Sequence, residues 1–297
     1  MAVVGSQSPE SIADAVVGAL TGAGEVRPGP LRRLRLHLAW AALAAIGLTC
    51  QGGGAAQDYT VVARFPHDTS AYTQGLVYSR GQLYESTGRL GYSQLRHVEL
   101  TTGRVLVATE LAADRFGEGL TLLDGRLYQL TWKSGVGYVY RADNLALVDS
   151  FNFTGEGWGL ATDGNTLIMS DGSATLRFLD PQSFAVVRQV VVRDEGLPLT
   201  QVNELEYVAG QLYANVYQSD RIVQIDPTSG AVLHWFDLAG LLPEDERNST
   251  TDVLNGIAFD EESGNLLVTG KLWPALFELS LRRPDEVDSS TTGNAAR

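Results

Sequence analysis

The sequence predicts an all-β fold in which five four-stranded blades close into a ring, a five-bladed β-propeller. Three observations lead to this fold class. A β-hairpin pattern recurs five times, the copies follow one another at the length of a propeller blade, and a spare strand before the first copy can complete the last one. Short strands at regular spacing, with Gly, Pro and Asp in the turns and no helical period, indicate the same class.

The second copy of the hairpin is the clearest. Gly119–Leu123 forms its predicted first strand, Asp124 and Gly125 its turn, and Arg126–Thr131 its second strand. Asp-Gly between apolar runs indicates a type I′ turn, because both central residues of that turn need positive φ. One carboxylate, Glu118, stands between two glycines just before the first strand. We expect this carboxylate to carry the chemistry.

The five copies are aligned by the residue that opens each of them, here called the lead residue. The lead residues are Gln74, Glu118, Trp158, Asn203 and Asn255. Successive lead residues are 44, 40, 45 and 52 residues apart, which matches a four-stranded blade. The fifth copy ends after three strands, and the segment Tyr59–Phe65 can supply its fourth. Closing the ring with this N-terminal strand removes the exposed edges of an open array.

The chain divides into four predicted parts. Residues 57–282 form the propeller, 1–30 are expected to be disordered or an over-called translation start, 31–56 form a signal peptide and linker, and 283–297 form a disordered tail. A basic segment, Arg32–Arg35, precedes an apolar run that is too short to span a membrane, which indicates an export signal. We therefore expect an exported protein, periplasmic or on the cell surface.

Two forms of the exported chain stay open, one with a lipid anchor and one released by cleavage. Cys50, at the end of the apolar run, favours slightly a lipid anchor on the cell membrane. Alternatively, cleavage after Ala56 releases a chain that begins with Gln57. In that case Gln57 would itself be open to loss of ammonia.

Composition excludes several classes of partner. The formal net charge of −13 argues against nucleic-acid binding. A single cysteine rules out an internal disulfide, and no Cys/His motif for a metal is present. We expect a monomer without metal or cofactor.

Equivalent residues of a propeller face the same place, so the lead residues should open the innermost strands at the mouth of the central channel. Fourteen residues further lies a second ring of equivalent positions. It comprises Gly88, Trp132, Gly172, Tyr217 and, after a turn two residues longer, Lys271. Tyr72 and Phe116, each two residues before a lead residue, are expected to line the rim.

The two rings bring together one carboxylate, three amides, one lysine and an aromatic wall. No hydroxyl is paired with histidine, which disfavours triad hydrolysis, and a single acid disfavours a two-carboxylate glycosidase. The composition is typical of a small-ligand site. Structural interpretations stay open: blade packing for Trp132 and Trp158, turn hydrogen bonds for Asn203 and Asn255, and surface charge for Lys271.

Several motifs in the same order resemble the plant- and bacterial-type glutaminyl cyclases, also called glutamine cyclotransferases. The resemblance covers Tyr59–Leu281 and is carried by Tyr72–Leu76, Phe116–Leu120, Val202–Tyr207, Ala214–Tyr217 and Val268–Pro274. It implies a five-bladed propeller that converts the N-terminal glutamine of peptides or proteins to pyroglutamate and releases ammonia, without a metal.

The resemblance also implies roles for individual residues. The catalytic glutamate of the family falls on Glu118, and the polar substrate-binding residues fall on Gln74, Asn203 and Lys271. The aromatic pocket falls on Phe116, Trp132 and Trp158, with Tyr72 in place of a Phe and Tyr217 in place of a Trp. Competing functions are a calcium-dependent propeller lactonase and a non-catalytic peptide-binding propeller. Hard cations prefer several oxygen ligands, and the two rings offer one carboxylate.

Overall fold

The computed structural model describes residues 58–282, which belong to one of the two units of the chain, Gly53–Arg297. The predictions for the export signal, Cys50, Gln57 and the C-terminal tail lie outside the described residues. Within residues 58–282, no helix has the length and apolar character needed to cross a membrane.

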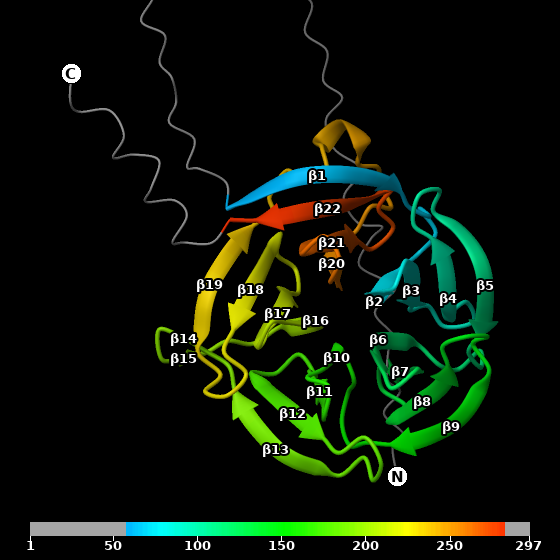
Figure 1. Cartoon of the computed structure of the whole chain (residues 1–297), viewed down its shortest axis with the longest axis vertical. Coiled ribbons are helices and arrows are strands. Elements are labelled where there is room, and N and C mark those ends of the chain that lie inside the picture. Colours follow the sequence, from blue (N-terminus) through cyan, green and yellow to red (C-terminus); the bar gives the residue numbers. More distant parts are fainter. Residues whose placement is uncertain (1–57, 283–297) are drawn as a thin grey trace, which may run out of the picture. The chain divides into compact units, whose positions relative to one another are not determined.

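Five four-stranded antiparallel sheets form the blades (Figure 1). In blades 1 to 4 the strands follow chain order from the centre outward, and in blade 5 the outermost strand is the N-terminal one. Blade 1 contains β2 (Thr73–Ser79), β3 (Gln82–Thr87), β4 (Gln94–Glu99) and β5 (Arg104–Glu110). Blade 2 contains β6 (Gly117–Leu123), β7 (Arg126–Thr131), β8 (Val136–Arg141) and β9 (Leu147–Asn152). Blade 3 contains β10 (Leu160–Thr162), β11 (Leu167–Met169), β12 (Thr175–Leu179) and β13 (Val186–Val191).

Blade 4 contains β16 (Val202–Val208), β17 (Gln211–Val216), β18 (Arg221–Ile225) and β19 (Val232–Asp237). Blade 5 contains β20 (Leu254–Asp260), β21 (Asn265–Gly270), β22 (Ala275–Leu281) and β1 (Tyr59–Pro66). A two-stranded ribbon, β14 (Arg193–Asp194) with β15 (Leu197–Pro198), joins blades 3 and 4, and a 3₁₀ turn, η1 (Glu244–Glu246), joins blades 4 and 5.

The N-terminal strand closes the ring as predicted. β1 pairs antiparallel with β22 along its whole length, from Tyr59 opposite Leu281 to Pro66 opposite Ala275. The innermost strands also contact one another around the channel, with β2 against both β6 and β20. The first and last segments of the described chain therefore share one blade, which protects both from fraying.

Burial follows the blade-to-blade contacts. In the described residues, one hydrophobic cluster lies between each pair of neighbouring blades, and blades 5 and 1 meet through a cluster that includes Leu76 and Leu267. Second strands such as β7 are buried on both faces, whereas outermost strands such as β5 are largely exposed. The core is thus shared between blades, so each blade depends on its neighbours for apolar burial.

The predicted type I′ turn is confirmed, because Asp124 and Gly125 have φ values of 50° and 72°. One detail of the prediction is wrong. Trp158 does not open its innermost strand, since β10 begins only at Leu160 and is three residues long. The side chain of Trp158 therefore projects from the loop that enters blade 3.

Candidate active site

The lead residues reach the channel mouth through a common backbone irregularity. Gln74, Glu118, Asn203 and Asn255 are each the second residue of an innermost strand. The pairing of each of these strands with its neighbour shifts register at that residue. A β-bulge redirects a side chain out of the regular alternation of a strand, and here it occurs where a side chain is needed at the channel.

The second ring is tied to the rim by a repeated hydrogen bond. In four blades, the residue that follows the second strand donates its backbone N–H to the carbonyl two residues before the lead residue. The pairs are Gly88 to Tyr72, Trp132 to Phe116, Tyr217 to Gln201 and Lys271 to Val253, at 2.9–3.0 Å. The bond places the side chains of both rings beside each other at one end of the channel.

Two glycines of the second ring make room for the aromatic walls. A Cβ at Gly88 would overlap the ring of Phe116, and a Cβ at Gly172 would lie 2.7 Å from the ring of Trp158. Gly172 also has a φ of +77°, which favours glycine. These two glycines therefore shape the site, because the absence of a side chain leaves room for the rings of Phe116 and Trp158.

Seven of the ten ring residues line one cavity of about 360 Å³, and Gly88, Gly172 and Asn255 do not. The lining side chains come from all five blades: Tyr72, Gln74, Arg89, Phe116, Glu118, Trp132, Trp158, Asn203, Tyr217 and Lys271. All nine residues predicted from the sequence as catalytic or substrate-binding are in this set, while Arg89 was missed. Asn255 is buried beneath the cavity and is not part of its lining.

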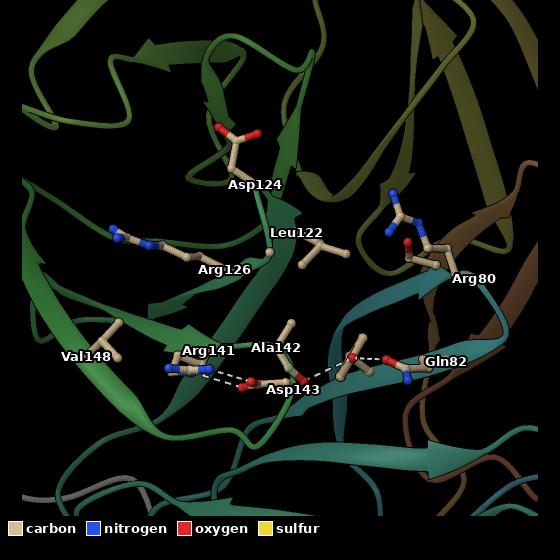
Figure 2. A pocket seen from close by; sticks show the side chains of 12 residues that line it. Arg80, Gln82, Leu122, Asp124, Arg126, Arg141, Ala142, Asp143 and Val148 are labelled. Carbon is tan, nitrogen blue, oxygen red and sulfur yellow. Dashed lines mark hydrogen bonds and ion pairs between the residues drawn. The ribbon is translucent and has the colours of Figure 1, made fainter.

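A larger hollow, of about 1000 Å³, lies at the opposite ends of the hairpins in blades 1 and 2 (Figure 2). Its lining includes Arg80, the turn residues Asp124 and Gly125, and an Arg141–Asp143 ion pair. None of the predicted site residues lies there. It is an open surface groove with charges that are partly paired, so the smaller cavity remains the candidate site.

Glu118 is the one acid among the residues that line the cavity, and its exposed fraction is 4%. Its Oε1 accepts a hydrogen bond from Nε2 of Gln74 at 3.0 Å. Burial raises the pKa of the Glu118 carboxyl well above its usual range; the Lys271 ammonium opposes this rise, and the Glu156 carboxylate adds to it. A carboxyl with a raised pKa is a stronger base than an ordinary glutamate once it is ionised.

Lys271 is buried and is not a surface charge. Its Nζ lies 4.8 Å from the ring centre of Tyr72 and 5.0 Å from that of Tyr217, which are cation–π contacts. Burial lowers the pKa of its ammonium, and the carboxylates of Glu118 and Asp252 oppose this shift. Opposite shifts at Glu118 and Lys271 are the effect of placing both groups in one desolvated site.

The aromatic side chains of the cavity form two groups of contacting rings. The ring of Phe116 lies 6.1 Å from that of Tyr72 and 5.6 Å from that of Trp132, while Trp158 packs edge-on against Tyr217 at 5.6 Å. These offset and edge-to-face arrangements are favourable for aromatic pairs. Trp132 and Trp158 therefore line the cavity rather than packing between blades.

The remaining polar groups show which amides are free. Asn255 donates from Nδ2 to the backbone oxygen of Thr73 at 2.9 Å and to Oε1 of Gln74 at 3.3 Å. Oδ1 of Asn203 and Oδ1 of Asn255 are both buried and have no hydrogen-bond partner among the described residues, but only Asn203 lines the cavity. Buried polar atoms without partners are rare and frequently mark ligand sites. Asn255 thus supports Gln74, and Asn203 keeps bonding capacity for a ligand.

One buried acid of the channel was also missed by the sequence analysis. The carboxylate of Glu204 accepts the backbone N–H of Leu76 at 3.2 Å and that of Ile257 at 2.8 Å, which joins blade 4 to blades 1 and 5. The sequence does set Glu204 apart, because it occupies the position after the lead residue, where the other four copies have glycine.

Fold and site together define a propeller enzyme with a single carboxylate in a small, aromatic-walled cavity. The model of the glutamine cyclotransferase family matches residues 37–281, and the chain belongs to this family. It is 45% identical over 243 residues to a glutaminyl-peptide cyclotransferase of Arabidopsis thaliana, covering 80% of this chain and 74% of that protein. It is also similar to the crystal structure of the glutaminyl cyclase of Myxococcus xanthus, with a TM-score of 0.70 and 38% identity, over 75% of this chain and 96% of that one.

Proposed function

We propose that the protein cyclises the N-terminal glutamine of peptides or proteins to pyroglutamate in the 360 Å³ cavity and releases ammonia. The observation that carries the mechanism is the buried Glu118, hydrogen-bonded to Gln74 and set among aromatic side chains. Family membership supports the reaction over the lactonase and binding-module alternatives.

Glu118 acts first as a base and then as an acid. The neutral α-amine of the substrate attacks the carbon of its own side-chain amide, and a new C–N bond forms. Glu118 takes the proton that this nitrogen loses and delivers it to the departing amide nitrogen, which leaves as ammonia when its C–N bond breaks. One carboxylate is enough, because the proton taken from the amine is the one delivered to the leaving ammonia. The raised pKa of Glu118 suits a group that must both accept and return a proton.

Lys271 stabilises the negative charge that develops on the amide oxygen. The Nε2 of Gln74 is already directed at Glu118, whereas Lys271 approaches the faces of two aromatic rings and forms no ion pair within residues 58–282. Its N–H groups are thus available to the substrate. A preorganised donor of this kind contributes roughly 10²–10³-fold to the rate in other enzymes.

The aromatic wall and Asn203 orient the substrate. Tilted and edge-on rings restrict the glutamine side chain to a folded shape, which brings the amine close to the amide carbon. The partnerless Oδ1 of Asn203 suits an N–H group of the substrate. Tyr72 and Tyr217 keep the wall aromatic, and burial together with the nearby Asp252 carboxylate raises the pKa of the Tyr72 hydroxyl above its usual value.

We further propose that the protein is exported and acts as a monomer on exported peptides. The basic segment before the apolar run supports export, and Cys50 supports a lipid anchor. Labelling with radioactive palmitate tests the anchor: label on the wild type and none on Cys50→Ala is expected, and an unlabelled wild type excludes it. Gel filtration of the soluble domain tests the monomer.

The reaction itself is tested by an ammonia-release assay on a peptide with N-terminal glutamine, combined with mass spectrometry of the product. We expect one ammonia per peptide and a product lighter by the mass of ammonia, with full activity in excess EDTA. Loss of activity in EDTA would support the calcium-dependent lactonase, and a bound but unchanged peptide would support the binding module.

A further inference from the structure

One carboxylate oxygen outside the predicted site bonds to both tryptophans of the cavity. Glu156 lies in the loop between β9 and β10, and its Oε2 accepts the indole N–H of Trp132 at 2.7 Å and that of Trp158 at 2.9 Å. Trp132 follows β7 of blade 2, whereas Trp158 enters blade 3. The two walls of the cavity therefore meet through a single atom of a third residue.

The second oxygen of this carboxylate faces a lysine. Nζ of Lys133 lies 3.7 Å from Oε1 of Glu156 and 3.9 Å from the ring centre of Trp132. Partial burial tends to raise the pKa of Glu156, but the bonds from both indoles and the nearby Lys133 ammonium outweigh it and hold the pKa below its usual value. Glu156 is consequently ionised at neutral pH, and both indole bonds are charge-assisted, which makes them stronger than neutral ones.

Glu156 is the acceptor for the N–H groups of both indoles. An indole offers one N–H donor, and in each case that donor is used on Glu156. Trp158 also packs against the ring of Tyr217 and against Gly172, and Trp132 packs against the ring of Phe116. Without the carboxylate, each indole N–H would lose its acceptor, and ring packing alone would hold its orientation.

We propose that Glu156 is a positioning residue that holds Trp132 and Trp158 in place in the aromatic lining of the cavity. This inference rests on the proposed function, in which the walls keep the substrate glutamine folded for ring closure. Glu156 does not touch the reacting atoms. It acts through the two tryptophans, and a displacement of about 1 Å in such a positioning group costs up to roughly 10²-fold in rate. Because its carboxylate also adds to the raised pKa of Glu118, the variants are compared at a pH above the acidic limb of the rate profile.

Two substitutions separate the hydrogen bonds from the charge. Glu156→Gln retains an oxygen that accepts indole N–H groups, whereas Glu156→Ala removes every acceptor. Glu99→Ala is the matched control, because Glu99 is also paired with a basic residue, Arg104, and its side chain is 36% exposed against 37% for Glu156. Far-ultraviolet circular dichroism establishes that each variant folds.

We expect kcat/KM to fall about tenfold or more in Glu156→Ala, to stay within about threefold of wild type in Glu156→Gln, and to be unchanged in the control. In a Trp132→Phe/Trp158→Phe background, the further addition of Glu156→Ala should have little effect, because its two partners are gone. An equal loss in that background, or a Glu156→Ala enzyme within twofold of wild type, would overturn the proposal.

Indole N–H resonances of the ¹⁵N-labelled protein test the contact without activity. The resonances of Trp132 and Trp158 should move in Glu156→Ala, while those of Trp235 and Trp273, bonded to Asp194 and to the carbonyl of Asp252, stay in place. Unmoved signals from Trp132 and Trp158 would refute the contact. This readout stays valid even if the wild type fails to release ammonia. Failure of the positioning role of Glu156 and failure of the proposed reaction are therefore distinguishable.

Discussion

Nε2 of Gln74 donates a hydrogen bond to Oε1 of Glu118 at 3.0 Å, and the two residues are lead residues of neighbouring blades. The contact requires the Gln74 amide to present its NH₂ to the carboxylate. Asn255 enforces this orientation, because its Nδ2 donates to the other side of the same amide, Oε1 of Gln74. Lead residues of blades 5, 1 and 2 thus form one directional chain that ends on the catalytic carboxylate.

Replacing Asn255 with alanine should weaken that chain. The Gln74 amide would lose the donor that sets its orientation, and the carbonyl of Thr73 would lose a buried partner. We predict that kcat falls about tenfold with a smaller change in KM, and that unfolding costs roughly 1–3 kcal/mol less. Steady-state kinetics and urea unfolding measure both effects. Asn265→Ala, which removes an amide bonded to Glu278, is the control and should leave kcat unchanged.

Lys271→Met tests the oxyanion donor and the electrostatics of Glu118 together. We predict a loss of roughly 10²–10³-fold in kcat. Since Glu118 must be ionised to act as base, kcat/KM of the wild type should rise as pH increases through its raised pKa. The Lys271 ammonium opposes that rise in pKa, so its removal should move the acidic limb of the pH profile to higher pH. A limb that stays in place or moves to lower pH would contradict this account.

Gly88→Ala tests the space that the second ring reserves for Phe116. The added Cβ would overlap the Phe116 ring, which must then shift into the cavity. We predict a rise in KM of about tenfold for a glutaminyl peptide, because the ring lies where the substrate must enter. Peptide kinetics measure this, with thermal unfolding as the check on folding. An unchanged KM would show that Phe116 does not shape the substrate pocket.

A buried network beside the site should make stability depend on pH. His67 bonds to Glu85 at 2.9 Å and to the carbonyl of Trp273 at 2.8 Å. Burial lowers the pKa of His67, but Glu85 and the Trp273 carbonyl outweigh it, so the net pKa is raised above the ordinary 6.5. Burial likewise tends to raise the pKa of Glu85, but His67 and Arg96 bring it below the ordinary 4.5.

The sign of each contribution follows from linkage. The contribution of His67 is complete below pH 6.5 and is lost as pH rises through its raised pKa. That of Glu85 is complete above pH 4.5 and is lost as pH falls through its lowered pKa. We predict that the free energy of unfolding of His67→Gln, measured by urea titration across pH, differs most from wild type in the acidic to neutral range. A difference in the free energy of unfolding that grows towards alkaline pH would contradict this prediction.

The fold was predictable because its signals are local and repeated. The Asp124-Gly125 turn needs only two residues to be recognised, and five equivalent hairpins fix the number of blades. The glycines after the lead residues belong to the same signal, since a Cβ at Gly119 would lie 2.5 Å from the backbone of Gly159 and Leu160 on the next innermost strand. Symmetry then places Gln74, Glu118 and Asn203 at one channel mouth.

What the sequence did not predict depends on contacts between positions that are not equivalent in the repeat. Glu156 stands two residues before the lead residue Trp158, as Tyr72 and Phe116 do before theirs, and Arg89 directly follows Gly88 of the second ring. The repeat therefore gives their positions, but not the contacts that their side chains make. Asn255 has the sequence of an ordinary Asn-Gly start, and its role appears only where β20 packs against β2. Trp158 departs from its expected place because β10 is shortened to three residues.

The most direct test of the account is the turnover of Glu118→Gln, a variant of nearly the same shape that cannot accept and return a proton. The ammonia-release assay on a glutaminyl peptide, with circular dichroism to confirm the fold, gives the comparison. We predict a fall in kcat of about 10²-fold or more with the fold intact, because general acid–base groups typically contribute 10²–10⁴-fold. A folded variant that retains more than about a tenth of wild-type turnover would contradict the proton-shuttle role of Glu118.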